Sequence, residues 1–118
     1  MEWQVEFFEE ENGRCPVEDF LQKLPNAHTG KILQVIRVLR EQGPALPFPY
    51  SSQVEGPLRE LRIHFGRHHY RVLYYGDPQR VFVLLHAFEK RTAQIPLQET
   101  SIAKQRMVID LGKKKGRL

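Results

Sequence analysis

The chain has 118 residues, of which 41% are hydrophobic and 27% are charged, so it fits one globular domain and excludes bulk disorder. Its single cysteine, Cys15, excludes an internal disulfide framework and suits a reducing cytoplasm. No apolar run approaches the ~18 residues that span a bilayer, and residues 1–11 are acidic where a signal peptide would be basic, so we expect neither a membrane protein nor an exported one.

The net charge of +4 is divided unevenly along the chain. Residues 1–57 carry 5 Lys/Arg against 9 Asp/Glu, whereas residues 58–118 carry 13 against 5. A basic half on a small domain indicates a polyanionic partner, with phosphate, as in nucleic acid, the leading candidate. The alternative is a solvated basic surface that also suits an acidic protein partner.

The first part of the chain predicts one strand followed by a helical hairpin. Apolar and polar side chains alternate over residues 3–8, which predicts a strand. Apolar positions at helical spacing predict a short helix over residues 16–24 and a longer one over residues 26–42, which Gly43-Pro44 ends. Two adjacent helices with a tight break between them form a hairpin.

Three strands are predicted for the middle of the chain. Residues 44–57 contain four of the eight prolines, so we expect an irregular crossover with no element of its own. The strands cover residues 58–65, 70–75 and 81–88. The short links between them indicate an antiparallel meander.

A final amphipathic helix begins at Pro96 and is expected to end at Gly112, and residues 113–118 form a basic tail. The order of elements is β-α-α-β-β-β-α. We therefore predict a single α+β domain over residues 1–118, with a twisted, mainly antiparallel sheet and the N-terminal helical hairpin on one face.

Cross-strand pairing is expected to gather polar side chains on one face of this sheet. A two-residue turn at Gly66-Arg67 pairs Arg62 with Arg71 and His64 with His69, and a four-residue turn keeps the same four side chains on one face. Like charges opposite each other are destabilising. The two arginines are therefore either neutralised by Glu60, which shares their face, or arranged to bind an anion such as phosphate.

The last strand extends this face. A four-residue loop at residues 76–79 pairs Arg71 with Leu84 and His69 with His86, and it places His86 and Lys90 beside the arginines. The opposite face is then expected to be the core against the helical hairpin. Its predicted members are Leu61, Ile63, Phe65, Val72, Tyr74, Val81, Val83 and Leu85.

Three histidines, His64, His69 and His86, would lie on adjacent strands in this register. His64 is a candidate acid–base group because imidazole titrates near neutral pH. A zinc site is an alternative for the three, but the neighbouring Arg and Lys side chains would repel a dication, so we expect no metal. His86, in an apolar strand, is interpreted as a core histidine with satisfied hydrogen bonds.

Three blocks of the sequence occur in a distinctive order. They are Leu58-Arg59-Glu60-Leu61-Arg62, then Tyr70-Arg71-Val72-Leu73-Tyr74, then Leu84-Leu85-His86-Ala87-Phe88-Glu89-Lys90-Arg91-Thr92 with Pro96. In this order and spacing, over nearly the whole chain, they resemble the RelE/ParE superfamily of toxins in its HigB-like, phage-derived branch. Ala103 and Arg106 also fit the A-x-x-R pattern of the last helix of that family.

The resemblance implies the fold given above and an endoribonuclease, an mRNA interferase, that cleaves mRNA on the ribosome through attack by the 2′-hydroxyl. It implies no metal or cofactor, no membrane partner, and a cognate helix-turn-helix antitoxin. One alternative is a ParE-like toxin that inhibits DNA gyrase and cuts no RNA. Another is an inactive relative that binds its antitoxin alone.

Carried over position by position, the resemblance implies a catalytic set consisting of Arg62, His64, Arg71, Lys90 and Arg91. The two strand arginines would stabilise the transition state, and the general base is left open between His64 and Lys90. Leu97 stands near the place where some members use a tyrosine. Further RNA contacts are expected from the basic tail and from Arg59, Arg67, His69, Lys104 and Arg106.

Overall fold

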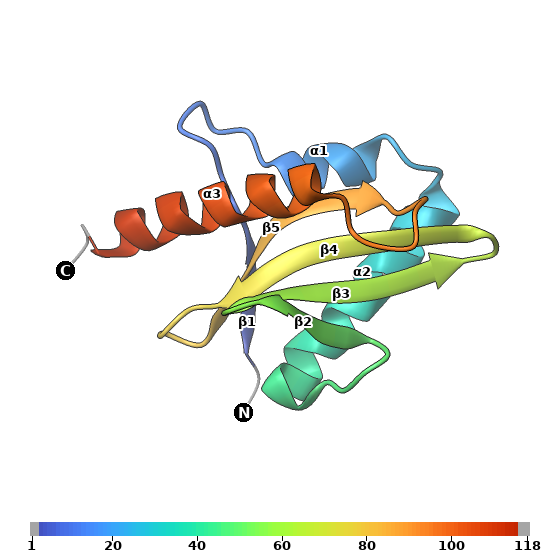
Figure 1. Cartoon of the computed structure of the whole chain (residues 1–118), viewed down its shortest axis with the longest axis horizontal. Helices are drawn as coiled ribbons and strands as arrows, with labels where there is room; N and C mark the ends of the chain where they lie inside the picture. The colour runs from blue at the N-terminus through green and yellow to red at the C-terminus, as the bar shows by residue number, and fades with distance from the viewer. Residues whose placement is uncertain (1–2, 116–118) are drawn as a thin grey trace.

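The computed structural model describes residues 3–115 and contains one five-stranded sheet with three α-helices (Figure 1). The elements in chain order are β1 (Gln4–Phe7), α1 (Pro16–Gln22), α2 (Asn26–Gln42), the short 3₁₀ helix η1 (Gly43–Ala45), β2 (Ser51–Glu55), β3 (Leu58–Phe65), β4 (His68–Gly76), β5 (Val81–Glu89) and α3 (Leu97–Lys115). Within residues 3–115, no helix is both long enough and apolar enough to cross a membrane.

The strands follow the order β1-β5-β4-β3-β2 across the sheet. Neighbours from β2 to β5 are antiparallel, and β1 lies parallel to β5. The predicted α+β class and the mainly antiparallel sheet are therefore confirmed. The parallel edge arises because α1 and α2 return the chain across the sheet between β1 and the meander.

The prediction that residues 44–57 form no element is wrong. They contain the last two residues of η1 and the edge strand β2, whose Ser51 pairs with Leu61 of β3. The Ser51 hydroxyl also hydrogen-bonds the Tyr74 hydroxyl at 2.6 Å inside the core. A mostly polar five-residue strand lacks the apolar alternation that reveals a strand in a sequence, and it forms because the edge of β3 offers backbone partners.

Helices cover both faces of the sheet. The hairpin of α1 and α2 packs on one face, as predicted, over a core that includes Val17, Ile32 and Leu61. Helix α3 crosses β4 and β5 on the other face, where Ala103 packs on a second core that includes Leu73 (Figure 1). The end of the sheet that holds the β3–β4 turn extends beyond the start of α3.

The β3–β4 hairpin has the predicted register. Arg62 pairs with Arg71, and His64 pairs with His69, around a two-residue turn. Gly66 has φ of +59°, which glycine adopts without strain and which the first position of such a turn requires. The four polar side chains therefore share one face, the one that α3 covers further along the sheet.

The predicted β4–β5 register is wrong. Arg71 pairs with Phe88, and Leu73 pairs with His86, whereas the next residue, Tyr74, pairs with Leu84. Leu85 is thus an extra residue on β5, a bulge that reverses the alternation of side chains along that strand. Because of the bulge, only some of the residues predicted to face the helical hairpin do so, and the others face α3.

On the hairpin face, the core predictions are confirmed for Leu61, Ile63, Val72 and Tyr74. The bulge instead turns Val81, Val83 and Leu85 toward α3, so these three predictions are wrong. Phe65, at the open end of β3, is 37% exposed and lies outside both cores.

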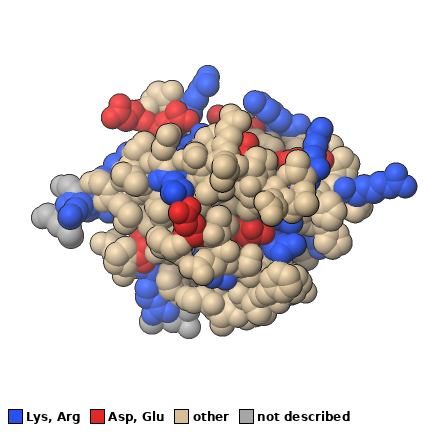
Figure 2. Space-filling view, viewed as in Figure 1, with Lys and Arg blue, Asp and Glu red and all other residues tan. Residues whose placement is uncertain are grey.

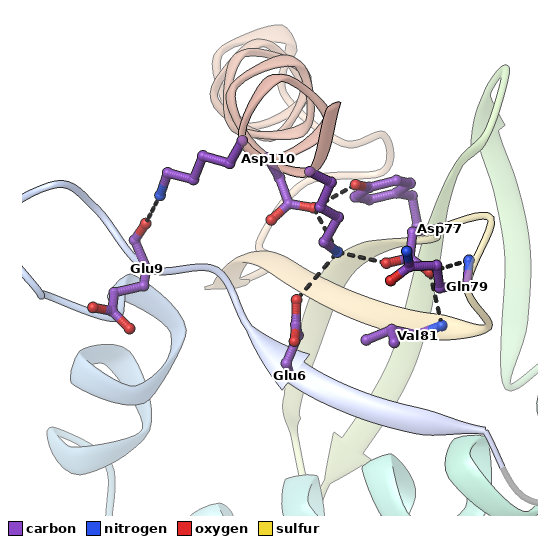
Figure 3. A network of polar contacts seen from close by, with 9 residues as sticks. Glu6, Glu9, Asp77, Gln79, Val81 and Asp110 are labelled. Carbon is purple, nitrogen blue, oxygen red and sulfur yellow. Dashed lines mark hydrogen bonds and ion pairs between the residues drawn. The ribbon is translucent and has the colours of Figure 1, made fainter. Parts of the chain in front are cut away.

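Helix α3 does not end at Gly112 but continues to Lys115, so residues 113–115 of the predicted tail are helical. Lys114 holds the last turn, with Nζ 2.6 Å from Asp77, 3.0 Å from Asp110 and 3.1 Å from Glu6 (Figure 3). Tyr75 donates a hydrogen bond to Asp110, and burial together with that bond raises the pKa of Tyr75. The rest of the predicted tail, residues 116–118, lies outside the described residues.

Candidate active site: a basic groove beside the β3–β4 turn

An open groove of about 520 Å³ lies where β3, β4 and the segment after β5 meet. Five of its eight lining residues are Lys or Arg, and the full lining is Arg62, Arg67, His69, Arg71, Glu89, Lys90, Arg91 and Thr92. Figure 2 shows Lys and Arg side chains at several places on this face, including the end of the molecule that holds the β3–β4 turn. The structure thus brings together most of the residues predicted for the site.

Arg71 forms the floor of the groove and is 4% exposed. Its Nη1 donates to the Tyr70 carbonyl at 3.1 Å, and its Nε lies 3.1 Å from Glu60 Oε1 with the N–H misaligned for a hydrogen bond. Burial lowers the pKa of Arg71, and the Glu60 charge opposes that effect.

Arg62 shares the same carboxylate, with Nε 3.6 Å from Glu60 Oε1. This geometry is compatible with both explanations of the arginine pair, which are neutralisation by Glu60 and binding of an anion. Glu60 offsets one of the two positive charges, which makes the pairing of Arg62 with Arg71 tolerable, and one positive charge remains. That remaining charge faces a groove whose other cations also attract an anion.

His64 and His69 project from neighbouring positions on β3 and β4, with ring centroids 6.2 Å apart. Both are exposed. Both line a second hollow of about 330 Å³ that adjoins the groove and also contacts Arg62 and Arg71. Two accessible imidazoles beside two arginines can accept and donate protons at a bound phosphate.

The segment after β5 contributes two cations, Lys90, which is bound by backbone carbonyls, and Arg91, which is exposed. Lys90 Nζ donates to the Thr92 carbonyl at 2.7 Å and to the Ala93 carbonyl at 3.0 Å, so it closes the loop that borders the groove. Arg91 is 79% exposed in its side chain and lies 3.4 Å from Glu89. Glu89 also accepts a hydrogen bond from His68 at 3.0 Å, and this bond lowers the pKa of Glu89.

Three residues predicted to contact RNA lie away from the groove. Arg59 is on the hairpin face, where Nε donates to the Ser51 hydroxyl at 3.2 Å. Lys104 on α3 lies 3.1 Å from Glu55. Arg106 points inward from α3 and donates to the carbonyl of the bulge residue Leu85 at 2.9 Å. These contacts connect elements of the fold.

His86 does not join His64 and His69, and the predicted pairing of His69 with His86 is wrong. His86 lies beneath α3, where Nδ1 accepts from Arg106 at 3.1 Å, so Nε2 carries the proton donated to Glu99 at 2.6 Å. Burial lowers the pKa of His86 against the opposing charge of Glu99. No group of three His, Cys, Asp or Glu within residues 3–115 could hold a metal ion.

Sequence reasoning missed the contribution of the segment that leads into β2. The Arg62 guanidinium lies 5.1 Å from the centroid of the Phe48 ring, and Tyr50 lines the second hollow. Neither residue belongs to a periodic pattern, and no signal in the sequence assigns them to the site. Their position follows from the pairing of β2 with β3.

Comparisons with known proteins converge on one group. Residues 19–108 match the family described as "Phage derived protein Gp49-like (DUF891)". The archaeal RelE-RelB complex from Pyrococcus horikoshii OT3 contains a chain that is similar to this one, with 25% identity, a TM-score of 0.51, and coverage of 79% of this chain and 100% of that chain. No curated protein sequence matches. The family match begins within α1, ends within α3 and contains every residue of the groove.

Proposed function

The chain belongs to the phage-derived Gp49-like family, a family of RelE-type toxins, and on that premise we propose that it is the toxin of a type II toxin–antitoxin pair that cleaves mRNA on the ribosome. The observation that carries the proposal is that Arg62 and Arg71, which share one carboxylate in the groove, also line the adjoining second hollow together with His64 and His69. We place it in the HigB-like branch because of the sequence blocks given above.

Cleavage of RNA by its own 2′-hydroxyl requires a base, an acid and stabilisation of a phosphorane. We assign the base to His64, which takes the 2′-hydroxyl proton as the 2′-oxygen forms a bond to phosphorus. The bond to the 5′-oxygen then breaks, and that oxygen takes a proton from the imidazolium of His69. The products are a 2′,3′-cyclic phosphate and a free 5′-hydroxyl.

The arginines supply the remaining requirement. Arg62 and Arg71 stabilise the charge that grows on the non-bridging oxygens of the phosphorane, and Arg91 holds an adjacent phosphate. Lys90 is the second candidate for the base. Two of its N–H donors are already used by backbone carbonyls, so we assign it to positioning of the loop.

The similar archaeal chain is a RelE protein in complex with RelB. By analogy, we propose that this chain is neutralised by a cognate antitoxin, which the sequence blocks suggest is a helix-turn-helix protein. An antitoxin that covers the basic groove would block the approach of RNA.

The decisive experiment expresses the protein without an antitoxin and maps the 5′ ends of cellular mRNA. We expect growth arrest and cuts inside reading frames, and we expect Arg71→Ala to lower the cleavage rate on programmed ribosomes by about 10²–10³-fold. Arg37→Ala, at an exposed position on α2, serves as the control. Growth arrest with intact mRNA and damaged DNA would instead indicate a gyrase inhibitor. The absence of any toxicity would indicate an inactive relative.

A further inference from the structure

Two large aromatic side chains, Phe48 and Tyr50, are exposed beside residues of the candidate site. Phe48 is 67% exposed and Tyr50 is 53% exposed, whereas Tyr70, Tyr74 and Tyr75 are almost completely buried. The three tyrosines of β4 therefore lie inside the core, whereas the two rings of the segment that leads into β2 are exposed. Two exposed rings that lie two positions apart in the chain, beside a candidate site, indicate a binding surface.

The segment is held firmly against β3. The backbone N–H of Arg62 donates to the Tyr50 carbonyl at 2.8 Å, and the Tyr50 N–H donates to the Pro47 carbonyl at 3.0 Å. The Arg62 guanidinium lies 5.1 Å from the centroid of the Phe48 ring, within the range of a cation–π contact. The Phe48 ring and the backbone of Tyr50 are therefore held next to Arg62, which also lines the groove.

The second hollow connects these aromatics to the chemistry. Its lining includes Tyr50 and Lys31 on one side and His64, His69 and Arg71 on the other. A ligand that reaches His64 with a phosphate group therefore has an aromatic surface directly beside it. Cations for phosphate and rings for a flat apolar group, at adjacent positions, match the alternating chemistry of a nucleic-acid chain.

We propose that Phe48 and Tyr50 form a stacking platform for a nucleobase of single-stranded RNA next to the bond that is cut, an inference that rests on the proposed function. Bases of unpaired RNA present flat faces that stack on Phe, Tyr and Arg planes. The platform recognises any base through its face, so it contributes binding and alignment of the strand and little sequence preference.

The test measures coupling between the platform and one base of the substrate. Wild-type protein, Phe48→Leu, Tyr50→Leu and the control Phe65→Leu are compared in single-turnover cleavage on programmed ribosomes, at protein concentrations below saturation. Phe65 is a suitable control because it is an exposed aromatic on β3 that faces His28 on the hairpin side. Each protein is assayed on intact mRNA and on mRNAs that lack the base of one nucleotide near the cleaved bond.

We expect each platform variant to cleave intact mRNA roughly 5- to 150-fold more slowly, the equivalent of about 1–3 kcal/mol per stacked base. We expect Phe65→Leu to match the wild type. Removal of the stacked base should slow the wild type by a similar factor, and the platform variants should then show no further loss on that mRNA. Urea unfolding midpoints equal to that of the wild type check that the variants are folded.

Four outcomes would overturn the platform. Stacking is excluded if the variants cleave intact mRNA at the wild-type rate. It is also excluded if, at every position tested, removing the base and substituting the aromatic slow cleavage independently, so that the two factors multiply. In both cases the proposed function stands. Unchanged cleavage together with weakened antitoxin binding would assign the aromatics to a protein partner. If the wild type cuts no mRNA at all, the proposed function fails and the platform fails with it.

Discussion

Replacing Lys114 with methionine tests how the last helix is attached to the sheet. The Lys114 ammonium lies within 3.1 Å of three carboxylates, of which Asp77 is fully buried in its side chain, Asp110 is 10% exposed and Glu6 is 49% exposed. Methionine keeps the length and the apolar stem of the side chain but removes the charge. Two nearly buried carboxylates then lose the cation that they share.

The expected loss follows from what each carboxylate retains. Removing one partner of a buried ion pair costs about 3–5 kcal/mol, because the other charge is left uncompensated. Asp77 still accepts from the backbone N–H groups of Gln79 at 2.8 Å and Val81 at 3.0 Å, and Asp110 keeps its bond from Tyr75. We therefore expect the lower end of that range, about 3 kcal/mol, or a fall in Tm of roughly 12 °C for a chain of this size.

The loss should depend on pH in a defined direction. Burial opposes ionisation of Asp77, but hydrogen bonds from Lys114 and two backbone amides lower its pKa overall. A carboxylate with a lowered pKa in the folded protein stabilises it above the ordinary value near 4, and that stability is lost as pH falls through the lowered pKa. The variant lacks the part of this contribution that comes from Lys114, so its deficit should shrink below about pH 4.

Alkaline pH acts on the lysine. Burial opposes ionisation of Lys114, but its bonds to Asp77, Asp110 and Glu6 raise its pKa overall. The stability from Lys114 is therefore fully present below its ordinary value near 10.5 and is lost as pH rises through the raised pKa. Between about pH 5 and 10 the difference from the wild type should stay constant.

Urea unfolding followed by circular dichroism across this pH range measures the difference. Lys115→Met is the matched control, because the adjacent Lys115 is exposed and the substitution makes the same change in charge. The double variant Lys114→Met with Asp77→Asn should recover part of the loss. If Lys114→Met at pH 7 lies within about 0.5 kcal/mol of the control, the buried ion cluster does not stabilise α3 and the reasoning is refuted.

Three further predictions concern the groove. Glu60→Gln should destabilise the protein by about 1–3 kcal/mol in urea unfolding, because Arg71 stays buried without its counter-ion; unchanged stability would contradict that role. His64→Ala should slow the cleavage step while ribosome affinity stays constant, because the group that takes the 2′-hydroxyl proton is lost. A cleavage step that is unchanged in His64→Ala but slowed in Lys90→Met would move the base to Lys90. A zinc-selective chelator should leave cleavage unchanged, and inhibition would count against a metal-free mechanism.

The sequence alone was sufficient for the β3–β4 hairpin and for the residues that it brings together. A two-residue turn with alternating strands on both sides determines the register locally, so the pairs Arg62 with Arg71 and His64 with His69 could be predicted. The hairpin of α1 and α2 was equally accessible, because helical spacing and Gly43-Pro44 are signals within the segment itself.

Lys90 shows where local signals were insufficient. Its place on the arginine face was predicted through a β4–β5 register that is wrong. The groove that Lys90 borders depends on the register that the structure shows. The prediction placed Lys90 correctly because the true and predicted registers differ by an even number of residues near Arg71. Side chains alternate with period two, so an even shift preserves the face.

Only the tertiary structure decided the bulge at Leu85, the edge strand β2 and the inward direction of Arg106. The bulge carbonyl accepts a hydrogen bond from Arg106, which is 21 positions away in the chain, and β2 forms only where β3 leaves an unpaired edge. Alternation and turn residues report interactions between near neighbours in sequence. Contacts between distant segments leave no periodic pattern, because their energy depends on where the rest of the chain has already folded.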